Sequence, residues 1–179
     1  MHGIVFTSLR HFVTSRFGAS CTDELWESEP PFLATRAYPD EEFHRLLGKI
    51  VERTRSDPTD LLRDFGEFAA ARTFACLYPA AFVEAGGTRA FLLTVEERIH
   101  ELVRATVPDA SPPALHVEPL DDDSVKIVYT SPRRLCVLLR GLVMGTASHY
   151  GERVQMRERA CILEGGEACI FEVRVRSGR

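Results

Sequence analysis

Two parts of this sequence carry the side chains best suited to chemistry: His100, and the segment from Tyr129 to Arg133 about thirty positions later. A neutral imidazole binds metal ions near neutral pH, because its unperturbed pKa is about 6.5. Tyrosine, serine and arginine side chains together donate hydrogen bonds to a carboxylate or a phosphate. The first part therefore offers a metal ligand, and the second offers a site for an anion.

His100 lies in a segment that apolar spacing predicts to be one helix, from Thr88 as a possible cap to Val107. The apolar line of this helix consists of Leu92, Val95, Ile99 and Leu102. His100 borders that line, so we expect its imidazole to point toward covered space. Two interpretations are open at this stage: a partly buried histidine bonded to a backbone carbonyl, or a metal ligand.

Tyr129 and Ser131 are two residues apart, so they face the same way on an extended chain. We expect Ser131 to cap the next helix, with Pro132 at its first position and Arg133 in its first turn. Arg133 can bind a carboxylate with two hydrogen bonds, and a helix N-terminus adds its positive dipole. The alternative is a capped strand-to-helix turn with an exposed arginine.

An imidazole in an apolar setting and a carboxylate-binding cluster together fit one cofactor. Haem requires an axial ligand for its iron and donors for its propionates. No Cys-x-x-Cys-His attachment motif occurs, so the expected cofactor is non-covalent haem b, iron protoporphyrin IX.

Helices come first in the chain and strands later. Apolar spacing predicts helices over 3–17, after Asp40 as N-cap, from Asp57, over 88–107 and over 132–150. Alternation predicts strands over 115–119, 124–129, 153–159 and 168–175. We therefore expect a single domain over 1–179 of the α+β class, in which a helical N-terminal part packs on an antiparallel sheet with an inserted helix.

The composition argues against several classes of protein. The chain has 179 residues, of which 45% are hydrophobic and 27% charged, as in ordinary globular proteins. A net charge of −4 and scattered arginines argue against nucleic-acid binding. No apolar run approaches the roughly 18 residues of a membrane helix. The N-terminal residues also lack the basic flank of a signal peptide, so we expect a cytoplasmic protein.

The segment Tyr129-Thr130-Ser131-Pro132-Arg133 resembles the propionate-binding Y-x-S-x-R motif of the haem nitric oxide/oxygen binding (H-NOX) family. The segment 99–103, with the later Pro112-Pro113, resembles the family's proximal histidine helix and the proline pair after it. Further matches are Met1-His2-Gly3, Phe17-Gly18, Tyr38-Pro39-Asp40, Phe65-Gly66 and the segment 141–145. The resemblance extends to about residue 175 and implies the H-NOX fold.

The resemblance also implies roles for individual residues. His100 would be the axial iron ligand, Pro113 would press on the porphyrin, and the propionates would be held by Tyr129, Ser131 and Arg133.

The distal pocket that the resemblance implies is formed by Leu9, Ala69, Leu138 and Leu142. Family members that hold oxygen have a tyrosine where this chain has Leu138, and neither Leu9 nor Ala69 supplies a hydrogen-bond donor. Bound O₂ gains strongly from such a donor, whereas NO binds ferrous iron well without one. The resemblance therefore implies the nitric oxide-selective branch.

The implied function is a haem-based gas sensor that binds NO, and also CO, at ferrous haem. We expect a separate histidine kinase or cyclic-nucleotide enzyme as partner, because 179 residues leave no room for such a domain. The alternative is a haem-free module for a small ligand or a protein, since the segment 164–171 is similar to vinyl-reductase-type domains. An enzyme is not expected, because we find no convincing nucleophile–base set.

Five cysteines, an odd and widely spaced set, fit reduced thiols better than a disulfide framework. Cys161 and Cys169 flank a glycine turn between two predicted strands. Some members of the H-NOX family carry a cysteine-rich zinc site in this region, but two cysteines do not make a four-ligand site. We expect two buried thiols here, with a redox-formed disulfide as the alternative, and we do not nominate Cys136 as a ligand.

Overall fold

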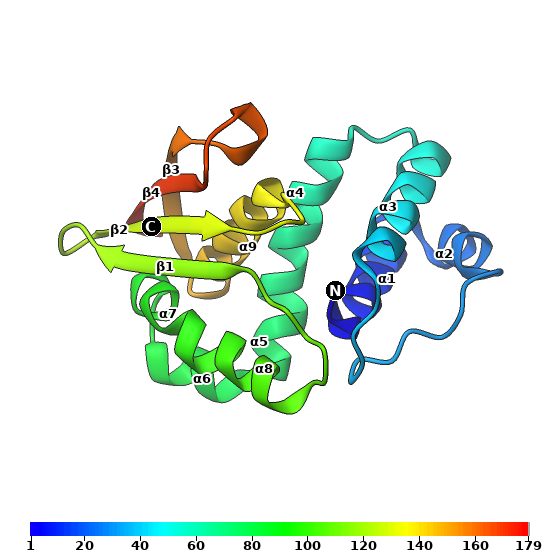
Figure 1. Ribbon diagram of the computed structural model, residues 1–179, viewed down its shortest axis with the longest axis horizontal. Helices are drawn as coiled ribbons and strands as arrows, with labels where there is room; N and C mark the ends of the chain where they lie inside the picture. The colour runs from blue at the N-terminus through cyan, green and yellow to red at the C-terminus, as the bar shows by residue number, and fades with distance from the viewer. Residues whose placement is uncertain (179) are drawn as a thin grey trace.

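The computed structural model describes residues 1–178, and helix α4 runs between a helical part and a part built on a sheet (Figure 1). The α-helices are α1 (Gly3–Phe17), α2 (Ala19–Trp26), α3 (Asp40–Thr54), α4 (Pro58–Phe68), α5 (Ala75–Leu77), α6 (Pro79–Ala85), α7 (Thr88–Val95), α8 (Glu101–Thr106) and α9 (Cys136–His149). Two π-helical turns, η1 (Ala69–Phe74) and η2 (Glu96–His100), join α4 to α5 and α7 to α8, and a 3₁₀ turn, η3 (Ile162–Glu164), follows β3.

The sheet contains β1 (Ala114–Pro119), β2 (Ser124–Thr130), β3 (Glu152–Ala160) and β4 (Cys169–Ser177) in the order β1-β2-β4-β3. All its neighbouring strands are antiparallel, and α9 is inserted in the chain between β2 and β3. The α+β class and the inserted helix are therefore confirmed. Among the described residues, no helix has both the length and the apolar character needed to cross a membrane.

Each of the two parts has its own hydrophobic core. In the helical part, α1, α3 and α4 bury a core that includes Phe6, Leu9, Phe43 and Phe65. In the sheet part, the apolar positions of β2 and β4 pack against α9. The spacing of apolar residues in the sequence matches this burial, because a helix buries every third or fourth residue and a strand every second.

Helices α4 and α9 connect the two cores by a close approach of their backbones. A Cβ atom on Gly141 would lie 2.0 Å from the carbonyl oxygen of Arg63, and one on Gly145 would lie 2.2 Å from that of Glu67. No larger side chain fits at either position without moving a backbone. The two glycines therefore fix how α9, which forms part of the cavity described below, lies on α4.

Two of the expected helix caps are wrong. Helix α3 has Pro39 at its N-cap, and Asp40 is its first residue. The Asp40 carboxylate instead accepts hydrogen bonds from the Met1 amine at 2.7 Å and from Arg133 Nε at 2.8 Å. Helix α7 has Gly87 at its N-cap. The backbone N–H of Thr88 donates to the Glu152 carboxylate at 2.8 Å, so a distant side chain does the capping.

The expected start of the helix after Ser131 is also wrong, because α9 begins at Cys136 rather than at Pro132. Residues 131–135 form a turn, in which Arg134 has a φ of +54° and its backbone N–H donates to the Ser131 carbonyl. Arg133 therefore lies before the helix and not in its first turn. Helix α2 was not expected, since only Thr22 and Leu25 are buried in it and its apolar pattern is weak.

Candidate functional site

A cavity of about 210 Å³ is lined by residues from both parts of the molecule. Its lining is mostly aliphatic and aromatic. The few polar side chains in the lining are His2, Tyr78, His100, Ser111, Tyr129, Ser131, Arg133 and Thr146. A largely apolar cavity with a small set of convergent polar groups is the usual form of a cofactor site.

His100 reaches this cavity from the π-helical turn η2, in which the backbone N–H of Glu101 donates to the Glu96 carbonyl, five residues earlier. The side chain of His100 is only 15% exposed, and its Nδ1 lies 2.7 Å from Glu96 Oε2. Its hydrogen-bond partner is thus a carboxylate and not a backbone carbonyl. With the proton on Nδ1, the lone pair of Nε2 is available for a metal.

The electrostatic surroundings of His100 favour the neutral ring. Burial lowers the pKa of His100 below its ordinary value, although the hydrogen bond to Glu96 opposes this effect. Burial raises the pKa of Glu96, but hydrogen bonds from Arg104 and His100 outweigh it and hold that pKa below its ordinary value. Neutral imidazole beside an ionised carboxylate is the protonation state in which a histidine binds a metal ion.

The expected anion-binding residues come together at the end of β2. Tyr129 and Ser131 are 4% and 2% exposed, and both line the cavity with Arg133. The Tyr129 hydroxyl accepts a hydrogen bond from the backbone N–H of Leu135 at 3.2 Å, and burial raises its pKa. Its own proton remains free to be donated to an anion, because a phenol both donates and accepts.

Arg133 is held in place from two sides. Its Nε donates to Asp40 Oδ1 at 2.8 Å, and its Nη1 donates to the Ser111 carbonyl at 2.5 Å. The same Asp40 oxygen accepts from the Met1 amine, so two cations share one carboxylate beside the cavity. This leaves an excess of positive charge, which suits an anionic ligand. Sequence reasoning missed Asp40 and the Met1 amine, since 93 residues separate Asp40 from Arg133.

His2 supplies an independent indication of a polar ligand. It lines the cavity, and both of its ring nitrogens are buried without a hydrogen-bond partner among the described residues. Buried polar atoms are almost always paired in folded proteins. The orphaned imidazole, the excess cation and the apolar walls all fit haem, which combines a broad apolar ring with two carboxylates.

The other predicted residues divide between the cavity and the core. Pro113, Ala69, Leu138 and Leu142 line the cavity. Leu9 is fully buried in the core of the helical part and is not among the lining residues. The apolar wall near Ala69 and Leu138 therefore comes from η1 and α9, and the first helix contributes Ile4 and Val5 instead.

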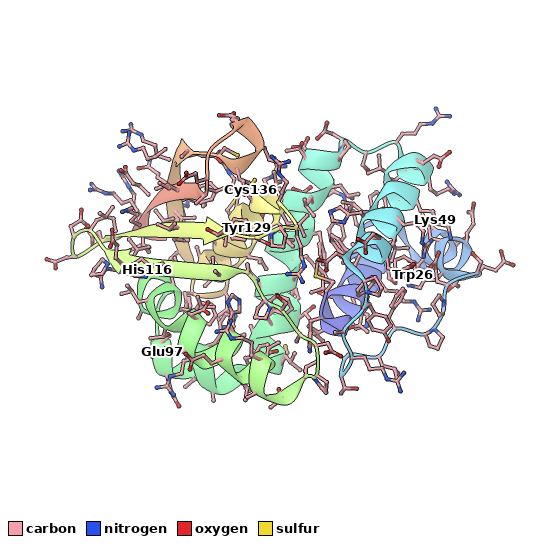
Figure 2. All side chains as sticks on the ribbon, in the orientation of Figure 1. Trp26, Lys49, Glu97, His116, Tyr129 and Cys136 are labelled. Atoms are coloured by element: carbon pink, nitrogen blue, oxygen red, sulfur yellow. The ribbon has the colours of Figure 1, made fainter. Side chains whose placement is uncertain are left out.

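A second group of metal-ligating side chains lies in the sheet part. Cys136, Glu158, Cys161 and Cys169 place their ligand atoms within 4.8 Å of one another. Cys136, labelled in Figure 2, belongs to the same buried cluster as Tyr129. The three thiols are buried and form no disulfide. Sequence reasoning passed over Cys136 and Glu158, because the fold alone brings α9 and β3 to the glycine turn. Burial raises the pKa of Cys136, which favours its protonated thiol.

This second group has enough donors for a four-coordinate metal ion. One of the four, Glu158, already accepts a hydrogen bond from Arg140 at 2.9 Å. The backbone N–H of Ile162 also donates to Cys169 Sγ at 3.2 Å. The expected burial of Cys161 and Cys169 is confirmed, and the fold adds a third thiol and a carboxylate to them.

Comparison with known proteins assigns the fold and the family. The model of the haem-NO-binding (HNOB) family matches residues 2–158, and the chain belongs to that family. The comparison with curated proteins found no match.

Solved H-NOX structures have the same fold as this chain. An H-NOX protein from S. oneidensis in the Fe(II)NO ligation state is 23% identical, with a TM-score of 0.89 over 99% of this chain and 100% of that one. The H-NOX domain from Shewanella oneidensis in the Fe(II)CO state is 23% identical, with a TM-score of 0.88 over 98% and 99%. A mutant of the unliganded Fe(II) H-NOX protein from K. algicida is 26% identical, with a TM-score of 0.84 over 99% and 97%.

Proposed function

We propose that this protein is a haem-based gas sensor that binds non-covalent haem b through His100 and detects nitric oxide. The observation that carries the proposal is the pairing of His100 with Glu96 at the apolar cavity, since it leaves Nε2 as a neutral ligand nitrogen. Membership of the haem-NO-binding family supports it. The bound haem would supply a ferrous iron that binds a diatomic gas.

The remaining polar residues of the cavity would hold the propionates. Arg133, Tyr129 and Ser131 are donors, and the Met1 amine adds positive charge on the far side of Asp40. Pro113 lines the same cavity and would contact the porphyrin. Hydrogen bonds within the protein hold Arg133, Ser131 and Tyr129 in place, so little ordering of these donors would be needed on binding.

The choice of nitric oxide rests on the apolar residues of the cavity. Ala69, Leu138 and Leu142 carry no hydrogen-bond donor in their side chains. Polarised O₂ would find no donor there, whereas NO and CO require none. We further propose that the protein acts in the cytoplasm as a sensor and not as an enzyme. Its signal would pass to a separate histidine kinase or cyclic-nucleotide enzyme.

The test of this proposal is His100→Gly, with His116→Gly as its control. His116 lies on β1, and its side chain is 75% exposed (Figure 2). We expect His100→Gly to lose the Soret band and to regain it when imidazole is added, because free imidazole fits the space of the lost side chain. The control should keep the spectrum of the wild type. A normal haem content and spectrum in His100→Gly would show that His100 is not the iron ligand. A wild type that takes up no added haem would support a haem-free binding module instead.

A further inference from the structure

Glu96 is the side chain through which the polypeptide acts on the imidazole of His100. Its Oε2 accepts a hydrogen bond from His100 Nδ1 at 2.7 Å, and its Oε1 accepts one from Arg104 at 2.5 Å. The exposed fraction of the Glu96 side chain is 30%, against 15% for His100 and 41% for Arg104. The carboxylate is therefore fixed between an imidazole at the cavity and a guanidinium at the surface.

The position of Glu96 on the helix is specific. Glu97 and Glu101 are also close to His100 in the sequence, but both are exposed, and Figure 2 shows Glu97 on the outer side of this helical layer. Among the described residues, Glu96 is the carboxylate that hydrogen-bonds His100. Both residues belong to the π-helical turn η2, and such turns are frequent at functional sites.

A carboxylate that accepts the Nδ1 proton of a histidine has two effects on the other ring nitrogen. It fixes the tautomer and the orientation of the ring, and it makes Nε2 a stronger electron donor. Arg104 shares the charge of Glu96 and keeps its carboxylate from rotating away. The strength of the axial bond would thus depend on a residue that does not itself enter the cavity lining.

We propose that Glu96 is a positioning residue that strengthens the bond from His100 to the haem iron. This inference rests on the proposed function, since it requires His100 to be the axial ligand. The cofactor is the haem of the proposed function. What this inference adds is that Glu96 and Arg104 control the strength of its bond to His100.

The test compares Glu96→Gln with Glu97→Gln in the haem-loaded ferrous protein. Glutamine keeps the size of the side chain and a neutral acceptor but removes the charge. We expect the iron–histidine stretching band in the resonance Raman spectrum to move to lower frequency in Glu96→Gln, and the haem reduction potential to rise. In Glu97→Gln both should stay at the wild-type values, because Glu97 faces away from His100.

A second variant tests the same idea in the opposite direction. In Arg104→Gln, the charge of Glu96 is no longer shared with a guanidinium, so Glu96 should act more strongly on His100. The iron–histidine stretching band should then move to higher frequency. This variant also serves if Glu96→Gln fails to fold. Unchanged bands in both variants would overturn the inference, as would a lower melting temperature with no spectral change, which indicates a merely structural pair. Absence of an iron–histidine band from the wild type would instead overturn the proposed function.

Discussion

The polar and apolar halves of the cavity lining are built in different ways. Three polar side chains that would touch haem are each fixed by a partner: His100 by Glu96, Arg133 by Asp40 and Tyr129 by the backbone of Leu135. The apolar half, formed by Ala69, Leu138 and Leu142, lines the cavity but has no hydrogen-bond donor in its side chains. We infer that the polar half would determine whether haem is held, and that the apolar half would determine which gas it can bind.

Removing a cation from the polar half should have the largest effect. A bidentate, charge-assisted contact is about twice as strong as a neutral hydrogen bond. We therefore expect Arg133→Ala to lose haem to an apo-globin trap faster than Tyr129→Ala or Ser131→Ala. Equal rates for the three variants would show that the charge of Arg133 adds nothing to the hydrogen bonds.

Adding a donor to the apolar half should have a smaller effect. Leu138→Tyr would place a phenol at the cavity, and a hydrogen bond to polarised O₂ contributes about 1 kcal/mol. We expect this variant to show an O₂-dependent spectrum in air, at least at low temperature, while its NO spectrum changes little. The matched control is Leu138→Phe, which has a similar ring and no hydroxyl. An O₂ response in the phenylalanine variant would mean that ring size and not hydrogen bonding governs gas choice.

The smallest expected effect concerns the support of Arg133 in the haem-free protein. Burial raises the pKa of Asp40, but its hydrogen bonds to the Met1 amine and Arg133 outweigh this and leave that pKa below its ordinary value of 3.8. The ion pairs therefore stabilise the fold above about pH 3.8 and are lost as the pH falls through the lowered pKa.

We expect Asp40→Asn to lower the free energy of unfolding at pH 7 by about 1 kcal/mol or less, because Asp40 is partly exposed. The difference from the wild type should shrink below pH 3.8 and vanish once Asp40 is protonated. Urea titrations of the haem-free protein at several pH values measure it. A difference that stays constant down to the lowest pH would assign the effect to packing.

Local patterns in the sequence predicted those features that depend on neighbouring residues. The alternation of Val125, Ile127 and Tyr129 is the buried pattern of β2, and the apolar spacing before His100 is that of a helix. The π-helical turn at Glu96–His100 was not predicted, and it shifts the buried face of the helix by one residue. Val103 is therefore buried, whereas Leu102, which even helical spacing placed on the apolar line, is 48% exposed. Without that turn, Glu96 and Glu97, four and three residues before His100, were equally plausible as its partner.

Long-range contacts escaped prediction for a different reason. Asp40 looked like a helix cap because its neighbourhood is that of a helix start, and nothing local indicates that its partner is Arg133. Cys136 likewise meets Cys161 only because α9 packs on the sheet next to the glycine turn. Leu9 was assigned to the cavity by resemblance, but the tight core of the helical part encloses it completely.

One measurement tests the central claim most directly: the visible absorption spectrum of the reduced wild-type protein under argon, under NO and in air. A haem held by His100 with no donor on its distal side should give a Soret band that changes with NO and forms no stable O₂ spectrum in air. A persistent O₂ spectrum would show that another residue supplies a donor. A colourless protein that takes up no added haem would contradict the account altogether.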